Sequence, residues 1–304
     1  MALAGLMGSA SLSVSAHERP LGDGKIAATP KQGHLLACQT RFNPNAPGAA
    51  RSGPWITGAR YDPAEKPVVS GSVTWPSEIA ITLEGSDRVI RANNLPNHPT
   101  GVFPIARSDE AFRYDRNPNR IRAQEIVLTL PAEPAMAASP SCVPMGMIGF
   151  ALSGAAIYSA VDARGRDAPA YEMQDACQGH PQERGQYHYH DRSVCLDDTR
   201  GQPGGHSDLV GYALDGFGIF GLYGENGEAL TNGDLDACHG HSHTVIWDGA
   251  AKAIYHYHLT DEYPYSIGCF RGTPVRSDLA GERPPPPHGR PPPRRGQRPP
   301  PPDR

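Results

Sequence analysis

Two segments of the chain, "GQYHYHDRSVCL" at residues 185–196 and "IYHYHLT" at residues 254–260, contain the same tetrapeptide, Tyr-His-Tyr-His. Side chains alternate between the two faces of a β-strand, so a strand here places both tyrosines on one face and both histidines on the other. If the tyrosines pack inward and the two strands come together about a pseudo-twofold axis, four imidazoles converge. The repeated tetrapeptide therefore predicts two equivalent strands and a histidine cluster.

The tetrapeptide is one of four anchors that recur in the same order along the chain. Co-linear anchors of this kind predict two related structural units. The matched pairs are "IGFALSGAAIY" at 148–158 with "VGYALDGFGIF" at 210–220, "DACQGH" at 175–180 with "DACHGH" at 236–241, the two tetrapeptides, and Cys195 with Cys269. We place the internal repeats at about residues 146–195 and 208–269.

Both units are predicted to be rich in β-structure. The segments "MIGFAL" and "LVGYAL" combine aromatic and branched residues and run into Ser153-Gly154 and Asp215-Gly216, dipeptides typical of hairpin turns. Further strands are predicted upstream at "SVTW" (72–75), "IAITLEG" (79–85), "DRVIRANN" (87–94) and "IVLTLPA" (126–132). The expected fold is mainly β, a duplicated β-rich unit in a pseudo-twofold arrangement.

The two ends of the chain differ from its middle. Residues 1–16 form a short run of apolar and small side chains that ends at Val14-Ser15-Ala16. This pattern predicts a signal peptide and a secreted or periplasmic protein. Residues 276–304 hold eleven of the 32 prolines in their last 21 positions. Such a Pro/Arg-rich tail favours extended polyproline II without a packed core, so we expect it to be disordered and able to contact a partner protein.

Composition excludes several classes of protein. The 304 residues suffice for a sizeable core, and 38% hydrophobic with 20% charged residues is typical of a globular chain. No apolar run reaches the roughly 18 residues that a membrane span needs, so no transmembrane segment is expected. The net charge of −4 is weak, and nothing in it points to a nucleic-acid partner.

The six cysteines fit an exported protein with disulfide bonds, although six cysteines allow about 15 pairings. Equivalent positions in the two units favour the pairs Cys177–Cys195 and Cys238–Cys269, which leaves Cys38 and Cys142. Alternatively, Cys177 and Cys238 are thiolate metal ligands beside the histidines of their Cys-x-Gly-His segments. An oxidising compartment favours disulfides over thiolates.

Nine of the thirteen histidines lie between residues 180 and 258. An H-x-H pair on a strand holds two imidazoles side by side, close enough to share one ion, and imidazole suits zinc, copper, iron and nickel. Buried histidines that simply bond to carbonyls are the alternative. The candidate ligands for a copper or zinc ion are His188, His190, His256, His258, His180, His241 and His206. We expect His239 and His243 only to support the site or to be solvated.

Several ordered motifs carry a resemblance to a known family. The two tetrapeptides, "GHSDLVGYALDGFGIFG" (205–221), "LDACHGH" (235–241), "YPYSIGCFRG" (263–272) and "NNLPNHPTGVFP" (93–104) are similar to those of the YHYH-domain family. The resemblance covers residues 70–275, which leaves an N-terminal extension at residues 17–69. It implies an exported bacterial protein without an assigned reaction.

Three functions from different classes fit these observations. The first is a metal-binding protein in which the paired histidines hold copper or zinc. The second is a metal-dependent hydrolase in which three histidines bind the ion, a water fills the fourth place and Asp215 serves as base. An aspartate before glycine more often bonds its own turn, so Asp215 has a structural alternative. The third is a metal-free carbohydrate-binding or adhesion module. The metal-binding protein is our first hypothesis.

Overall fold

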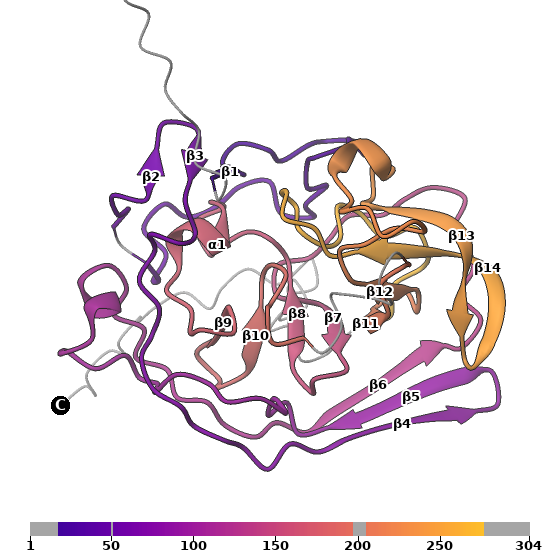
Figure 1. Ribbon diagram of the computed structural model, residues 1–304, viewed down its shortest axis with the longest axis horizontal. Coiled ribbons are helices and arrows are strands. Elements are labelled where there is room, and N and C mark those ends of the chain that lie inside the picture. The colour runs from indigo at the N-terminus through magenta and orange to yellow at the C-terminus, as the bar shows by residue number, and fades with distance from the viewer. Residues whose placement is uncertain (1–17, 50, 197–204, 277–304) are drawn as a thin grey trace, which may run out of the picture.

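The computed structural model describes residues 18–49, 51–196 and 205–276 of the chain. The predicted signal peptide and all but the first residue of the predicted tail lie outside these residues. The described part has the mainly β fold that the sequence predicts, with one large sheet and two small ones (Figure 1).

The large sheet has eight strands in the order β13-β14-β12-β11-β7-β8-β10-β9. These strands are β7 (Met147–Ala151), β8 (Ala156–Tyr158), β9 (Gly179–Pro181), β10 (Tyr187–Tyr189), β11 (Leu209–Ala213), β12 (Gly218–Phe220), β13 (Gly240–Trp247) and β14 (Ala250–His258). The central pair, β7 and β11, is antiparallel. Outward from it, both sides continue with an antiparallel, then a parallel, then an antiparallel neighbour. The same four-strand path thus occurs on each side of the β7–β11 pair.

The two predicted hairpin turns join β7 to β8 and β11 to β12. Gly154 has a φ of +87° and Gly216 a φ of +89°. This left-handed conformation is strained for residues with a Cβ atom, and a Cβ on Gly216 would also lie 2.7 Å from Pro131. The small dipeptides that end the two aromatic segments are therefore required by the turns.

Two three-stranded sheets flank the large one (Figure 1). One consists of β4 (Ile79–Glu84), β5 (Asp87–Ala92) and β6 (Ile126–Pro131), and the other of β1 (Arg19–Pro20), β3 (Arg60–Tyr61) and β2 (Ile56–Thr57). The helical segments are η1 (Glu110–Arg113), α1 (Ala168–Tyr171) and η2 (Asn232–Asp234). Three upstream strands thus form where the sequence predicts them. The fourth, at 72–75, is wrong: Val73 forms only an isolated bridge with Thr100.

The core runs along the large sheet from β13 to β10 and includes the alternating apolar residues of β6. The aromatic residues of the tetrapeptides are part of it: Tyr187, Tyr189 and Tyr257 are almost completely buried. Their histidine neighbours are buried as well. Both faces of β10 and β14 therefore pack inside the molecule, and the strands do not separate a dry face from a wet one.

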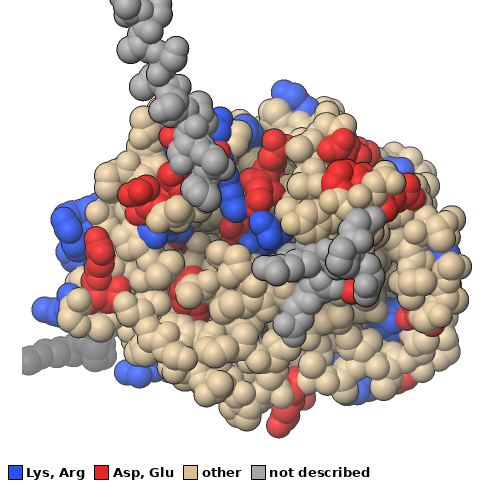
Figure 2. Space-filling model, viewed as in Figure 1, with Lys and Arg blue, Asp and Glu red and all other residues tan. Residues whose placement is uncertain are grey.

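Three disulfide bonds close the fold, with the pairing that the repeat favours. They are Cys38–Cys142, Cys177–Cys195 and Cys238–Cys269. No cysteine is therefore available as a thiolate ligand. Within the described ranges, no helix has the length and apolar character to cross a membrane. Figure 2 shows acidic and basic side chains interspersed on the face in view.

The two tetrapeptide strands do not come together. Between β10 and β14 lie β8, β7, β11 and β12. The expectation that four imidazoles converge on one point is therefore wrong, because each half of the sheet carries its own tetrapeptide strand toward its own outer edge.

Candidate metal centres

The first tyrosine of each tetrapeptide anchors a nearby turn. Tyr187 donates its hydroxyl hydrogen to Asp175 at 2.9 Å, and Tyr255 donates to Asp236 at 3.0 Å. Each aspartate also accepts hydrogen bonds from two backbone N–H groups of its own Asp-Ala-Cys turn. The tyrosine thereby fixes the turn that leads into the neighbouring outer strand.

The second tyrosine secures the hairpin of its unit, and this determines the role of Asp215. Tyr257 donates to Asp215 Oδ2 at 2.6 Å, and the same carboxylate accepts hydrogen bonds from the backbone N–H groups of Gly272 and Phe217. In the first unit Tyr189 bonds to Ser153 at 3.0 Å. Burial raises the pKa of Asp215. Since Tyr257 points away from the face of its two histidine neighbours, Asp215 is not brought to the imidazoles.

The histidine faces form two separate clusters. In the first, His180 of β9 pairs directly across from His188 of β10, and His190 follows on the same face. Ligand nitrogens of the three lie within 4.8 Å of one another. His188 donates Nδ1–H to the carbonyl of Gln186 at 3.1 Å, and His190 donates to that of Ser159 at 2.6 Å. These bonds fix the direction of both rings.

Glu172, which follows α1, is a fourth member of the first cluster. Its Oε2 lies 3.3 Å from His180 Nε2 and 3.2 Å from His190 Nε2. Although burial opposes the charged carboxylate, the nearby His180 and His190 hold the pKa of Glu172 well below its usual range. Against the effect of burial, Glu172 raises the pKa of His190. The Glu172 carboxylate thus lies beside two of the three imidazoles in an enclosed site. The side chains of Glu172, His180 and His190 are 5–14% exposed.

The second cluster has five histidines whose ligand nitrogens again lie within 4.8 Å of one another. His241 and His243 come from β13, His256 and His258 from β14, and His206 from the segment before β11. Strands β13 and β14 pair with each other, and His241 lies opposite His256.

Backbone carbonyls orient four of the five rings. Each of these rings donates its Nδ1 hydrogen to a backbone carbonyl oxygen. The bonds run from His206 to Ser207 at 2.6 Å, from His243 to Thr244 at 3.3 Å, from His256 to Ile254 at 3.0 Å and from His258 to Gly221 at 2.6 Å. A carbonyl only accepts hydrogen bonds, so Nδ1 carries the hydrogen and the neutral ring keeps a lone pair on Nε2. The same arrangement is common around histidines that bind metals through the other nitrogen.

The Nε2 lone pairs face one another at short distances. His206 Nε2 lies 3.2 Å from His258 Nε2 and 3.3 Å from His256 Nε2. Two lone pairs without a hydrogen between them repel, and a cation between them removes the repulsion. Nitrogens bound tetrahedrally at ~2.0–2.1 Å lie about 3.3–3.4 Å apart, close to these separations.

Burial keeps three histidines of the second cluster neutral. It lowers the pKa of His256 to about 2 and the pKa of His241 to about 4, and it places the pKa of His258 well below its ordinary value. Metals bind only the neutral form of the ring, and these histidines are already neutral at neutral pH. His206, His241 and His243 are only partly buried, so solvent reaches this cluster.

All seven histidines predicted as ligands lie in one of the two clusters. Two members were missed. His243 lies on the same, more buried face of β13 as His241. His239 lies before the strand, has a φ of +72° and bonds to Thr260 instead. Glu172 has no signal in the local sequence, because it reaches the cluster from the end of a short helix.

The comparison with known families identifies the domain in which both clusters lie. Residues 128–231 and 221–272 match the family model described as YHYH protein. Over these residues the chain belongs to the YHYH family. The match includes both tetrapeptides and all members of both clusters, and therefore every candidate ligand lies within the YHYH domain. No curated protein and no solved structure matches the chain.

Proposed function

We propose that this YHYH protein is an exported metal-binding protein that holds copper or zinc at two histidine sites. The observation that supports it is the opposition of Nε2 lone pairs in the second cluster, where His206 faces both His256 and His258. Buried polar groups are generally hydrogen-bonded, so a buried ring nitrogen that no donor reaches is available to a metal ion. These rings use one nitrogen and aim the other at their neighbours.

The two sites suit different tasks. The first has three imidazoles and the Glu172 carboxylate in a buried position, which is the number and kind of ligands of a closed zinc site. The second offers up to five neutral imidazoles and is reached by solvent, which suits an ion that is exchanged or delivered. We therefore propose a permanently held ion in the first site and an exchangeable ion in the second.

Export is part of the proposal. Three disulfides among six cysteines support a secreted or periplasmic location, since such bonds persist in oxidising compartments. The hydrolase alternative loses its proposed base, because Asp215 is bonded to Tyr257 on the opposite face from the histidines.

Elemental analysis of the protein purified from a periplasm tests the proposal. We expect two metal ions per chain, and about one in a variant with His206→Ala and His243→Ala, which are partly exposed and so tolerate truncation. His34→Ala is the matched control, because His34 lies outside both clusters and bonds only to a nearby carbonyl. Circular dichroism verifies that each variant is folded.

Absence of bound metal in the folded protein, even after incubation with copper and zinc, would contradict the proposal. The repeated histidines would then be structural, and the carbohydrate-binding or adhesion module would become the first hypothesis.

A further inference from the structure

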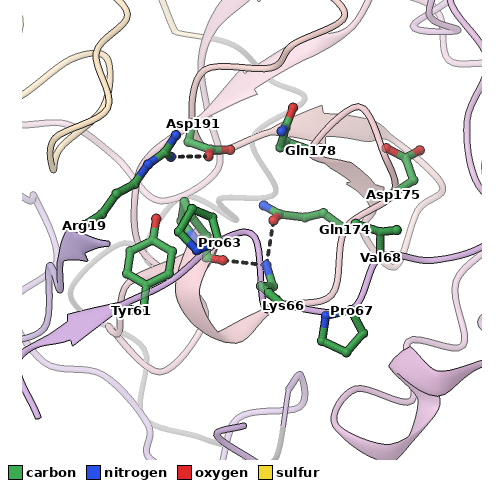
Figure 3. A pocket seen from close by; sticks show the side chains of 11 residues that line it. Arg19, Tyr61, Pro63, Lys66, Pro67, Val68, Gln174, Asp175, Gln178 and Asp191 are labelled. Atoms are coloured by element: carbon green, nitrogen blue, oxygen red, sulfur yellow. Dashed lines mark hydrogen bonds and ion pairs between the residues drawn. The ribbon is translucent and has the colours of Figure 1, made fainter. Parts of the chain in front are cut away.

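A small polar pocket lies between the N-terminal segment and the loops around α1 (Figure 3). Its volume is about 70 Å³. Arg19, Tyr61 and Lys66 line it from one side, and Gln174 and Asp191 line it from the YHYH domain. The first three residues lie outside the segments matched by the family model. The pocket is also separate from the histidine sites, since none of their members lines it.

Lys66 brings to this pocket a cation that no described carboxylate contacts directly. Its Nζ donates to the carbonyl of Pro169 and, at 2.8 Å, to Gln174 Oε1, which are both uncharged. Among the described residues, no carboxylate forms an ion pair with it. Burial lowers the pKa of Lys66 to about 8, so the ammonium is still charged at neutral pH.

Arg19, the other cation of the pocket, is already paired. It donates to Asp191 Oδ2 at 3.3 Å and to Asp261 Oδ1 at 2.7 Å, and Arg192 shares Asp261 with it. Two arginines and two aspartates balance one another.

Asp175, the other lining carboxylate, is held by Tyr187 and by backbone N–H groups. Among the described residues that line the pocket, Lys66 is therefore the cation without a carboxylate in direct contact, and Asp191 and Glu172 act on it only through space.

Two buried polar atoms of the pocket have no hydrogen-bond partner. They are Nε2 of Gln174, a donor, and Oδ1 of Asp191, an acceptor. Gln174 is 4% exposed and Asp191 is 6% exposed, so bulk water does not serve them. Figure 3 shows both side-chain ends facing the space between them. An unsatisfied buried group costs free energy, which a suitable ligand recovers.

We propose that this pocket binds a small α-hydroxy carboxylate, of about the size of glycolate. The carboxylate meets the Lys66 ammonium and the amide hydrogens of Gln174, and the hydroxyl group donates to Asp191 Oδ1. The carboxylate gives the Lys66 ammonium a direct ionic partner, and the hydroxyl hydrogen satisfies the unpaired Asp191 Oδ1.

The volume limits the ligand. A cavity of 70 Å³ equals roughly two waters at their liquid volume of about 30 Å³ each, which leaves space for a molecule of about five non-hydrogen atoms. Larger hydroxy acids would have to extend toward solvent, past the proline residues at the mouth.

Calorimetric titration of the full chain with three matched molecules tests the inference. Glycolate is expected to bind saturably with one molecule per chain. Acetate, which lacks the hydroxyl donor, is expected to bind about tenfold more weakly. Ethylene glycol, which lacks the charge, is expected not to bind.

Variants separate this pocket from the histidine sites, where a carboxylate could coordinate a bound metal. Lys66→Met is expected to abolish glycolate binding, and Lys252→Met, which removes a surface ammonium, is expected to leave it unchanged. Binding that persists in Lys66→Met would overturn the inference, as would equal affinity for acetate and glycolate or no saturable binding by the folded wild-type protein. All titrations use metal-free protein in the presence of a chelator, so that coordination of glycolate by a bound metal does not contribute.

Discussion

At the scale of the residue, one hydrogen bond decides what a histidine is able to do. A ring that gives its Nδ1 hydrogen to a carbonyl presents a lone pair at Nε2 in a fixed direction. His190 and His258 do this through equivalent carbonyls, those of Ser159 and Gly221, at 2.6 Å in both units. The sequence Tyr-His-Tyr-His thus encodes a pair of oriented ligands in each half of the sheet.

Glu172 gives a test of the first cluster. Glu172→Gln removes the only carboxylate of the described residues within 4 Å of His180 and His190, so we expect the first site to bind its ion at least tenfold more weakly while the second site keeps its own. Competition with a chromophoric chelator measures both affinities. Glu183→Gln, an exposed carboxylate of the same domain, serves as control. Equal loss in both variants would show that Glu172 does not ligate the ion.

Asp167 predicts a pH dependence of stability. Burial raises its pKa from 3.8 to about 7, although it accepts hydrogen bonds from Gly22 and Tyr265. Between these values the folded state binds more protons than the unfolded state, so stability falls as pH rises through this window. Asp167→Asn should abolish this loss and gain on the order of 3 kcal/mol relative to wild type between pH 4 and pH 7.5, at about 1.4 kcal/mol per pKa unit. Urea unfolding at the two pH values gives the difference, and a constant offset would contradict it.

At the scale of the element, the tyrosines of β10 and β14 attach the strands to their turns. Tyr257→Phe deletes the hydroxyl that donates to Asp215 and accepts from the backbone of Arg271. The buried Asp215 carboxylate then loses a partner, so we expect a loss of about 1–3 kcal/mol in the free energy of unfolding.

Tyr223→Phe is the control for that variant, because Tyr223 is partly exposed and lies outside the tetrapeptides. Denaturant unfolding monitored by fluorescence compares the two. If both substitutions cost the same, the bond to Asp215 is not a specific anchor of the turn.

At the scale of the whole molecule, the disulfides differ in how much chain they restrain. Cys38 and Cys142 are 104 residues apart, whereas Cys177 and Cys195 are 18 apart. In the chain-entropy description a loop of ~100 residues is worth about 4.7 kcal/mol and a loop of ~15 residues about 3 kcal/mol. Replacing the first pair by serine should therefore cost about 1.5 kcal/mol more than replacing the second, as measured by urea unfolding. The reverse order would show that native-state packing, and not loop length, determines the contribution of each bond.

Metal binding should also stabilise the whole fold. If the ligands converge only in the folded state, free metal at roughly 1,000 times its dissociation constant adds about 4 kcal/mol to the free energy of unfolding. Thermal unfolding with and without chelator measures this effect. An unfolding temperature that does not respond to metal or chelator would contradict binding to the folded state alone.

The local sequence predicts a large part of this protein because the features involved depend on near neighbours. The strands at 79–84, 87–92 and 126–131 follow from alternation and composition, and the hairpins follow from Ser153-Gly154 and Asp215-Gly216. The cysteine pairing follows from equivalent positions in the two units. The candidate histidines follow from the period of two, which places both members of an H-x-H pair on the same face of a strand.

Only the tertiary structure decides which histidines meet. The period of a strand fixes the face on which a side chain lies, but the order of strands in the sheet fixes its neighbours. Four strands separate β10 from β14, and this divides one expected cluster into two. His206 joins from a connecting segment and Glu172 from the end of α1, both by packing that no local pattern encodes. The sequence by itself determined the type of the candidate ligands and the strand face on which they lie. The fold alone determined the direction of their rings and their number in each cluster, because contacts between distant segments arise only when the core is complete.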